Sequence, residues 1–149
     1  MNDAKTALGH KILKLKKERG LSWPDLAARI GHAPVWTCAA CLGQMSMTAE
    51  AAAKTGAILG LSAEEIETLQ EIPYRGSLPT QVPTDPLIYR FYELVLVYGT
   101  TWKEMIHEEF GDGIMSAIDF DMTVERQPDQ KGDRVKVTMS GKFLPYKRY

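Results

Sequence analysis

The amino-acid sequence predicts a mainly helical α+β fold: a bundle of helices, further helices, and a C-terminal β-hairpin. Up to residue 72, apolar residues recur at helical spacing between capping residues and glycines. Residues 72–86 hold four of the eight prolines, which is typical of an extended linker. From Ile118 onward, apolar and polar residues alternate as they do in strands. We therefore expect two domains, 1–76 and 77–149.

Five short helices are expected in the first domain, because each apolar run there has a start or stop signal. The predicted helices cover residues 4–19, 23–30, 33–42, 49–59 and 63–71. Their predicted N-caps, whose side chains accept hydrogen bonds from free amides, are Ser22, Thr48 and Ser62. Glycines that end helices are Gly20, Gly31 and Gly43. This order predicts a repressor-like five-helix bundle.

The second domain is expected to begin with a helix from about Pro86 to Tyr98, capped by Asp85. Gly99 is predicted to break this helix, and a further helix is expected from Thr101 to Phe110. The first of the two is apolar nearly all round. We therefore expect it to be buried, either by its own fold or by other subunits.

A β-hairpin is predicted from the alternating residues Ile118–Val124 and Val135–Met139, joined by a turn at Gln127–Asp133. Ser140-Gly141 is predicted to turn the chain again, into the tail KFLPYKRY. A lone two-stranded hairpin is only marginally stable in water. We therefore expect the hairpin to pair with another subunit, which makes the protein an oligomer.

The composition is that of a folded protein, since 44% of the 149 residues are hydrophobic and 25% are charged. A formal net charge of −1 disfavours a general polyanion binder. No apolar run approaches the roughly 20 residues needed to cross a membrane. The first residues, MNDAKTALGHKILKLKK, carry charges where a signal peptide needs its apolar core. We expect a cytoplasmic location and no membrane partner, with an organellar address left open.

Residues 21–43 have the layout of a helix-turn-helix, so a DNA-binding regulator is one function to weigh. A recognition helix presents Arg, Lys, Asn or Gln to base edges and phosphates. The predicted helix 33–42 has no basic residue. Residues 1–76 hold nine basic and eight acidic side chains, so they lack the positive field that drives phosphate binding. DNA binding stays as the alternative function, and we expect no nucleic-acid partner.

The two cysteines, Cys38 and Cys41, lie in the string CAAC. A redox pair of the thioredoxin type sits at a strand-to-helix junction, and a structural zinc site needs about four ligands. Here the flanking residues are predicted to be helical, and the sequence has no second cysteine pair. Packed free thiols are therefore favoured, with oxidation or metal binding as the alternative. We expect no metal site.

Three polar side chains stand out in the second domain because their surroundings are apolar: Arg90, Glu93 and Ser116. Arg90 and Glu93 are three residues apart and share a helix face, which fits either a surface ion pair or a functional pair. Ser116 follows a Gly-Asp-Gly turn at 111–113, whose glycines permit backbone angles that expose amides to an anion. His107 is interpreted as a structural or surface histidine, with a catalytic role as the alternative. An enzyme that acts on small anions is therefore the second function to weigh, and the spacing alone leaves it open.

The stretch PTDPLIYRFYELVLVYGTTWKEMIHEEFGDGIMSAIDF closely resembles the cyanase family, also called cyanate hydratase or cyanate lyase. The segments GLSAEEIETLQEIPYRG and GKFLP are similar to the same family, so the resemblance covers essentially the whole chain. YRFYE, YGTT, HEEFGDGI and SAI carry the specificity. The N-terminal helices resemble the family mainly in their layout.

The resemblance implies that cyanate and bicarbonate react to give carbamate and carbon dioxide, after which carbamate gives ammonia and a second carbon dioxide. It implies no metal and no organic cofactor. The family's catalytic Arg, Glu and Ser correspond by motif to Arg90, Glu93 and Ser116. The resemblance also implies a homodecamer, a pentamer of dimers, with active sites between subunits and a dimer built by swapped C-terminal β segments.

Overall fold

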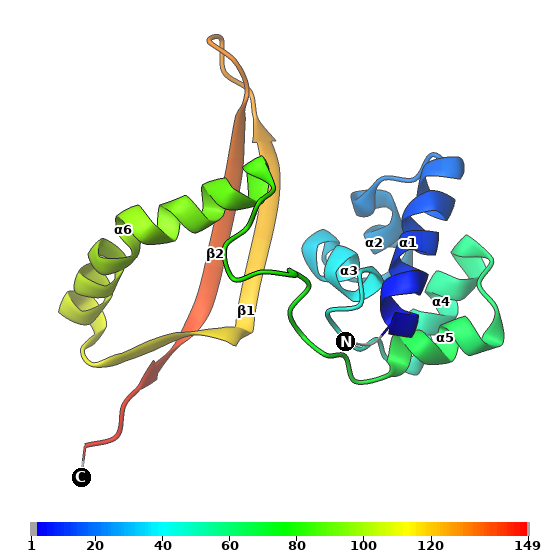
Figure 1. The fold of residues 1–149 in the computed structure, drawn as a ribbon, viewed down its shortest axis with the longest axis horizontal. Coiled ribbons are helices and arrows are strands. Elements are labelled where there is room, and N and C mark those ends of the chain that lie inside the picture. The colour runs from blue at the N-terminus through cyan, green and yellow to red at the C-terminus, as the bar shows by residue number, and fades with distance from the viewer. Residues whose placement is uncertain (1–2, 149) are drawn as a thin grey trace. The chain divides into compact units, whose positions relative to one another are not determined.

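The computed structural model of the chain describes residues 3–148; Met1, Asn2 and Tyr149 lie outside the described part. The described residues form six helices and one antiparallel two-stranded sheet (Figure 1). The chain divides into two compact units, 1–77 and 78–149. The mainly helical α+β class that the sequence predicts is confirmed.

The first unit contains five helices, as predicted. They are α1 (Asp3–Glu18), α2 (Trp23–Ile30), α3 (Pro34–Cys41), α4 (Ala49–Leu59) and α5 (Ala63–Gln70). Every observed end lies within one residue of the predicted end, which is the usual uncertainty at a frayed terminus. Local capping signals were therefore sufficient to delimit these helices.

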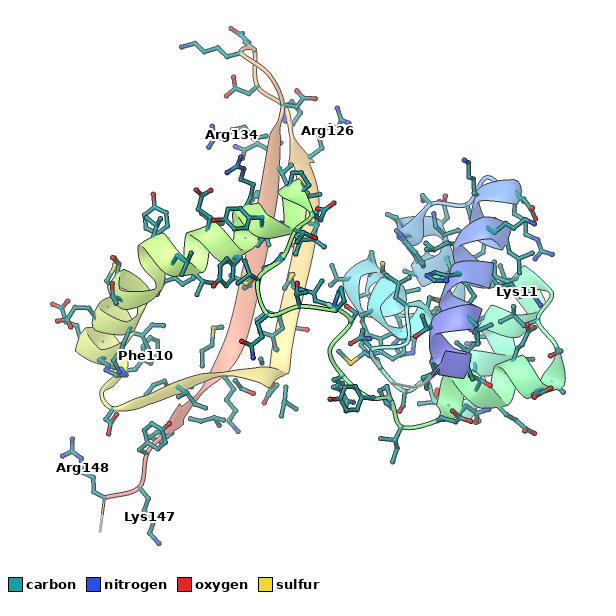
Figure 2. The ribbon with its side chains drawn as sticks, viewed as in Figure 1. Lys11, Phe110, Arg126, Arg134, Lys147 and Arg148 are labelled. Carbon is teal, nitrogen blue, oxygen red and sulfur yellow. The ribbon has the colours of Figure 1, made fainter. Side chains whose placement is uncertain are left out.

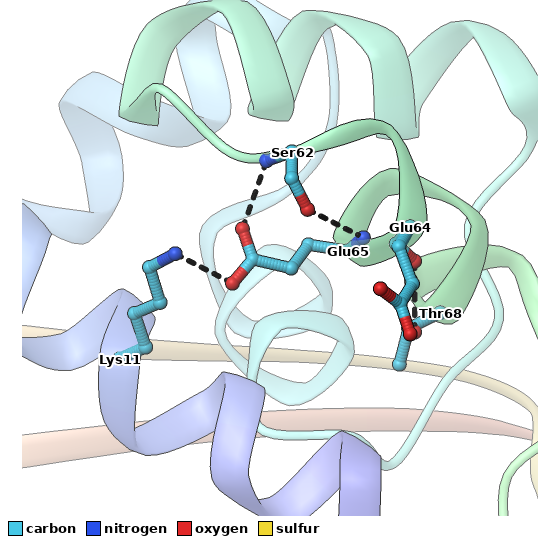
Figure 3. Close-up of polar contacts among 5 residues, drawn as sticks. All are labelled: Lys11, Ser62, Glu64, Glu65 and Thr68. Atoms are coloured by element: carbon cyan, nitrogen blue, oxygen red, sulfur yellow. Dashed lines mark hydrogen bonds and ion pairs between the residues drawn. The ribbon is translucent and has the colours of Figure 1, made fainter.

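The caps themselves form as the sequence predicts, and Figure 3 shows the one at the start of α5. The Ser62 hydroxyl accepts a hydrogen bond from the Glu65 amide at 3.2 Å, and the Glu65 carboxylate accepts one from the Ser62 amide at 2.8 Å. Lys11 of α1 donates to the same carboxylate at 2.5 Å. This capping box therefore also joins the first helix to the fifth.

An apolar core lies among the five helices. Ile12 of α1, Leu26 of α2 and Leu59 of α4 are each 0% exposed. Trp23 and Trp36 pack against its edge. Burying one such aliphatic side chain is worth about 1.5–3 kcal/mol, so this core is the main source of stability for the first unit.

Residues 72–85 contain no helix or strand, which fits the extended linker expected from the prolines. The start of this segment is attached to the first unit. The Ser46 hydroxyl donates to the Glu71 carbonyl at 2.9 Å, and the Gly76 amide donates to the Gln44 side-chain oxygen at 2.8 Å. These bonds hold the chain against the bundle before the second unit begins.

The second unit begins with one long helix, α6 (Pro86–Phe110). Asp85 caps it, accepting hydrogen bonds from the Leu87 and Ile88 amides at 2.9 Å each. The predicted break at Gly99 is wrong, because α6 passes through this residue without interruption. A glycine inside a helix costs only about 1 kcal/mol relative to alanine, which the residues on either side outweigh.

Strands β1 (Gly113–Gln127) and β2 (Arg134–Pro145) form the predicted hairpin, but both are longer than expected. The predicted turn at Ser140-Gly141 is wrong, since β2 continues through both residues to Pro145. Figure 1 shows the long hairpin in the second unit, with the chain returning from the end of α6 into β1. The turn is at the other end of the hairpin, near the labelled Arg126 and Arg134 in Figure 2.

The second unit leaves its apolar side chains open. Within the described chain, α6 has no buried residue. Leu96 is 62% exposed and Met105 is 63% exposed.

Among residues 3–148, no helix is both long enough and apolar enough to cross a membrane.

Candidate active site

Arg90 and Glu93 lie one turn apart on α6 and form an ion pair. The Arg90 Nη1 atom is 2.9 Å from the Glu93 Oε2 atom. The two side chains are 68% and 46% exposed. Such an exposed pair contributes only about 0–1 kcal/mol to stability, so stability alone is a poor reason for its presence.

Burial of this helix by the chain's own fold was one of two expectations from the sequence, and it is wrong. Neither charged side chain is buried, and the apolar residues around them, such as Phe91 and Leu94, are 48% and 41% exposed. A single helix cannot bury apolar side chains that project from all of its own sides. Coverage by other subunits therefore remains as the prediction for α6.

Ser116 lies in β1 and is buried, with 6% of its surface exposed. Its hydroxyl oxygen accepts hydrogen bonds from the Ile118 amide at 3.0 Å and the Asp119 amide at 2.9 Å. A hydroxyl oxygen has two lone pairs and one hydrogen. Both lone pairs are occupied here, so the remaining capacity of the hydroxyl is to donate its hydrogen, as to an anion.

The two amide bonds close an irregularity in the hairpin. The strands pair at Met115 with Phe143 and again at Phe120 with Gly141. Four residues of β1, 116–119, thus face one residue of β2. Such bulges redirect side chains within a sheet. This one holds the Ser116 side chain inward at the start of the bulge.

A small packed corner secures β1 to the end of α6 just before Ser116. The His107 Nε2 atom is 3.2 Å from the Gly113 carbonyl oxygen, and the Tyr146 amide donates to the Asp112 carbonyl at 3.0 Å. The ring of Phe110, labelled in Figure 2, lies 5.1 Å from the ring of Phe143. His107 therefore has a structural contact, and sequence spacing alone could not identify its partner.

The glycines at 111 and 113 serve this corner in a way that the sequence did not indicate. Gly111 has φ 86° and its amide donates to the His107 carbonyl at the end of α6, so it is already engaged. Gly113 lies in extended β1 backbone, where a Cβ atom would come within 2.4 Å of the Leu144 carbonyl oxygen. The turn shapes the chain before Ser116, and its Gly111 amide is not free for an anion.

The three candidate residues do not form one hydrogen-bonded cluster within a single chain. Ser116 bonds the amides of its own bulge, whereas Arg90 bonds Glu93. Across residues 3–148, no hydrogen bond joins Ser116 to the ion pair on α6. The second unit therefore presents an exposed guanidinium and a buried hydroxyl donor as separate parts.

Burial raises the pKa of the Cys41 thiol to about 12, with a smaller contribution from the neighbouring Cys38. Burial also raises the pKa of Cys38, against a smaller opposing effect of Lys16. Raised pKa values disfavour the thiolate that redox and metal chemistry needs. Within the part of the chain that the structure describes, no three His, Cys, Asp or Glu side chains gather into a metal-binding group.

The helix that would read DNA contributes to the core of the bundle instead. Helix α3 buries Thr37, Ala40 and Cys41 and has no basic residue in its last turn. Trp36 stacks on His32 with 4.1 Å between the ring centres. A helix-turn-helix layout whose second helix has no basic residue, joined to a unit with an Arg–Glu pair, fits the class of enzymes better than that of DNA-binding regulators.

Two family models match the chain, one in each unit. The cyanate hydratase N-terminal model matches residues 5–73, and the cyanate lyase C-terminal domain model matches residues 80–148. A cyanate hydratase of Methylibium petroleiphilum is 64% identical over 139 residues, which cover 93% of this chain and 95% of that protein. The chain therefore belongs to the cyanate hydratase family, whose members are also called cyanases or cyanate lyases.

Further relatives extend the match in sequence and in structure. A cyanate hydratase of Polynucleobacter asymbioticus is 57% identical over 145 residues, or 97% of this chain and 99% of that protein. The crystal structure of cyanase from T. urticae has a TM-score of 0.83 at 39% identity, covering 93% of this chain and 96% of that chain. These findings do not favour the DNA-binding alternative.

Proposed function

We propose that this protein decomposes cyanate with bicarbonate, giving ammonia and carbon dioxide by way of carbamate. Membership of the cyanate hydratase family supports cyanate as the substrate. The observation in the structure that carries the proposal is the Arg90–Glu93 pair, a guanidinium bonded to a carboxylate on an exposed apolar helix. Such a group suits the planar oxygens of bicarbonate.

In the proposed reaction, a bicarbonate oxygen forms a bond to the carbon of cyanate, and the bicarbonate proton passes to the cyanate nitrogen. The product is a dianion. The bridging oxygen then separates from the carbon that came from bicarbonate. With uptake of a proton, this cleavage releases carbon dioxide and carbamate. Carbamate then takes up a second proton and gives ammonia and another carbon dioxide. The reaction consumes two protons and needs no change of oxidation state.

Arg90 is assigned the task of bringing the two anions together. Cyanate and bicarbonate repel each other, and a guanidinium stays charged while offering five N–H donors. Within residues 3–148 this guanidinium makes one hydrogen bond, to Glu93 at 2.9 Å, which leaves its other donors for substrate. Glu93 is assigned the role of orienting this guanidinium. Holding two reactants in place supplies much of the rate enhancement in such reactions.

Ser116 is assigned the role of an anion donor. Its hydroxyl accepts two amide hydrogen bonds, which leaves its hydrogen available for an oxygen on which negative charge develops. A nucleophilic role is disfavoured, because a nucleophile needs a lone pair and an adjacent base. Among the described residues, the only groups bonded to this oxygen are amides.

We further propose that other copies of the chain complete the site in a homodecamer, a pentamer of dimers. The exposed apolar surface of α6 supports this proposal. So does the hairpin, where Met122 pairs with Met139 and Val124 with Val137 on one face, of which Val124 is 58% and Met139 52% exposed. The cytoplasmic location stays a prediction from the sequence.

The test is ammonia release from cyanate by purified protein, in buffer freed of carbon dioxide, with and without added bicarbonate. We expect ammonia only when bicarbonate is present. Release that is independent of bicarbonate would contradict the mechanism. No release at all would contradict the assigned substrate.

A further inference from the structure

The two strands lie in tight contact directly beside Ser116, at Gly141 of β2. A Cβ atom built on Gly141 would lie 2.3 Å from the Ser116 carbonyl oxygen. It would also lie 2.6 Å from the Cγ atom and 3.2 Å from the Sδ atom of Met115. Non-bonded carbon atoms prefer separations of about 3.5–4.0 Å, so any larger residue at this position forces the strands to shift.

The need for glycine here is one of space. Gly141 is absent from the glycines with positive φ, so its backbone conformation is open to any residue. Gly132, in contrast, has φ 119° and no atom near its missing side chain, as an ordinary turn glycine does. Position 141 therefore requires glycine because the bulge of β1 packs directly against it.

The contact between Gly141 and the bulge also affects the position of the Ser116 hydroxyl. The carbonyl that meets Gly141 belongs to Ser116 itself, whose side chain is bonded to the Ile118 and Asp119 amides only two and three residues further on. A backbone carbonyl cannot rotate away as the end of a flexible side chain can. Displacing it would change the distances from the hydroxyl to both amides.

We propose that Gly141 is a positioning residue for Ser116. By permitting the bulge to lie against β2, it fixes the hydroxyl with both lone pairs occupied and its hydrogen directed to substrate. This assignment rests on the proposed function for its kinetic test. Its geometric test, the protection of the Ile118 and Asp119 amides, does not depend on the reaction.

The kinetic test compares Gly141→Ala with Ser116→Ala. Removing one preorganised donor costs about a hundredfold to a thousandfold in rate, and a misplacement of about 1 Å costs about a hundredfold. We expect Gly141→Ala to lower kcat/KM by about a hundredfold. Ser140→Ala, one residue away on the same strand, is the matched control and should retain activity.

The double variant decides whether Gly141 acts through Ser116. Once the hydroxyl is gone, adding Gly141→Ala to Ser116→Ala should reduce kcat/KM by less than about twofold, because residues that act as a unit are not additive. A general structural role predicts the same fractional loss in both backgrounds. That additive result would overturn the proposal.

Hydrogen–deuterium exchange followed by mass spectrometry gives the readout that is independent of activity. We expect the Ile118 and Asp119 amides to exchange faster in Gly141→Ala than in the wild type, and unchanged exchange in Ser140→Ala. If the wild type fails to act on cyanate, only the proposed function fails, and this comparison still stands. Unchanged exchange in Gly141→Ala would overturn the positioning role.

A second variant covers the case in which Gly141→Ala does not fold. Met115→Ala/Gly141→Ala removes the contacts with Met115 and keeps the one with the Ser116 carbonyl. The same loss of activity and the same faster exchange are expected, with Met115→Ala as its control. Full activity of this double variant would show that the carbonyl contact is unimportant, which contradicts the proposal.

Discussion

The two units of this chain use their apolar residues in opposite ways. In the first unit Leu26 and Leu59 are fully buried, whereas in the second Leu96 is 62% exposed and Met105 is 63% exposed. The first unit is therefore complete as a single chain. The second has no comparable core among its described residues, and its apolar helix needs a surface that the chain does not itself supply.

All three candidate catalytic residues belong to the incomplete unit. Arg90 and Glu93 lie on its open helix, and Ser116 is buried in β1, next to the packed corner at the end of α6. Stability is thus concentrated in the first unit and the proposed chemistry in the second. Substitutions in the two units should consequently differ in what they change.

The largest effect is expected from Arg90→Lys. A lysine keeps the charge but loses the planar fork, so we expect kcat/KM for cyanate to fall by about a hundredfold to a thousandfold. Arg126→Lys is the matched control, since Arg126 forms a similar exposed pair with Asp133 at 2.8 Å. Steady-state kinetics would separate them. Equal activity of both variants, with assembly intact, would remove Arg90 from the mechanism.

Paired leucine truncations test the difference in packing directly. Leu26→Ala should destabilise the protein by about 2–5 kcal/mol at any protein concentration, because it leaves a cavity in a complete core. Leu96→Ala should instead weaken assembly, so that its loss of stability grows on dilution. Thermal unfolding at several protein concentrations distinguishes the two. A large effect of Leu96→Ala that is independent of concentration would contradict our interpretation of α6.

The Cys41 thiol tests the first unit through its alkaline stability. Its pKa is about 12 in the folded protein against 9.0 ordinarily, because of burial. The contribution of this pKa difference to the free energy of unfolding is present in full below pH 9. It is lost as the pH rises towards 12, because the thiol of the unfolded chain releases its proton first. The loss is on the order of a few kcal/mol. In chemical unfolding, the free energy of unfolding of Cys41→Ala should fall less steeply above pH 9 than that of the wild type. An equal fall in both proteins would contradict this prediction.

The smallest effect is expected at the cap of α5. Ser62→Ala removes the hydroxyl that accepts from the Glu65 amide, which should cost about 1 kcal/mol of unfolding free energy and leave catalysis unchanged. Thr68→Ala, on the same helix, is the control and should change stability by less than about 0.5 kcal/mol. Figure 3 shows both positions. A change in the kcat of Ser62→Ala would contradict the assignment of stability to the first unit and of catalysis to the second.

Local signals in the sequence were sufficient wherever a few neighbouring residues decide the structure. Ser22, Thr48 and Ser62 were identified as caps because a cap acts within one helical turn. Gly99 and the Ser140-Gly141 pair were misinterpreted for a related reason. A glycine was taken as a break or turn, but its role depends on what lies opposite it in the fold.

The candidate site divides in the same manner. Arg90, Glu93 and Ser116 were identified from motifs, and the Arg90–Glu93 contact follows from helical spacing. The bulge at 116–119 could not be predicted, because it depends on how β1 pairs with residues far along the chain. The approach to Gly141 depends on the same pairing.

The most direct test of the account is complementation between two strongly impaired chains, Arg90→Lys and Ser116→Ala, co-expressed so that they assemble together. If each site takes its arginine and its serine from different chains, roughly a quarter of the sites in mixed assemblies receive both intact residues. We predict that bicarbonate-dependent ammonia release reappears in the mixed assemblies. Activity no higher than that of the two parents would contradict an active site completed between chains.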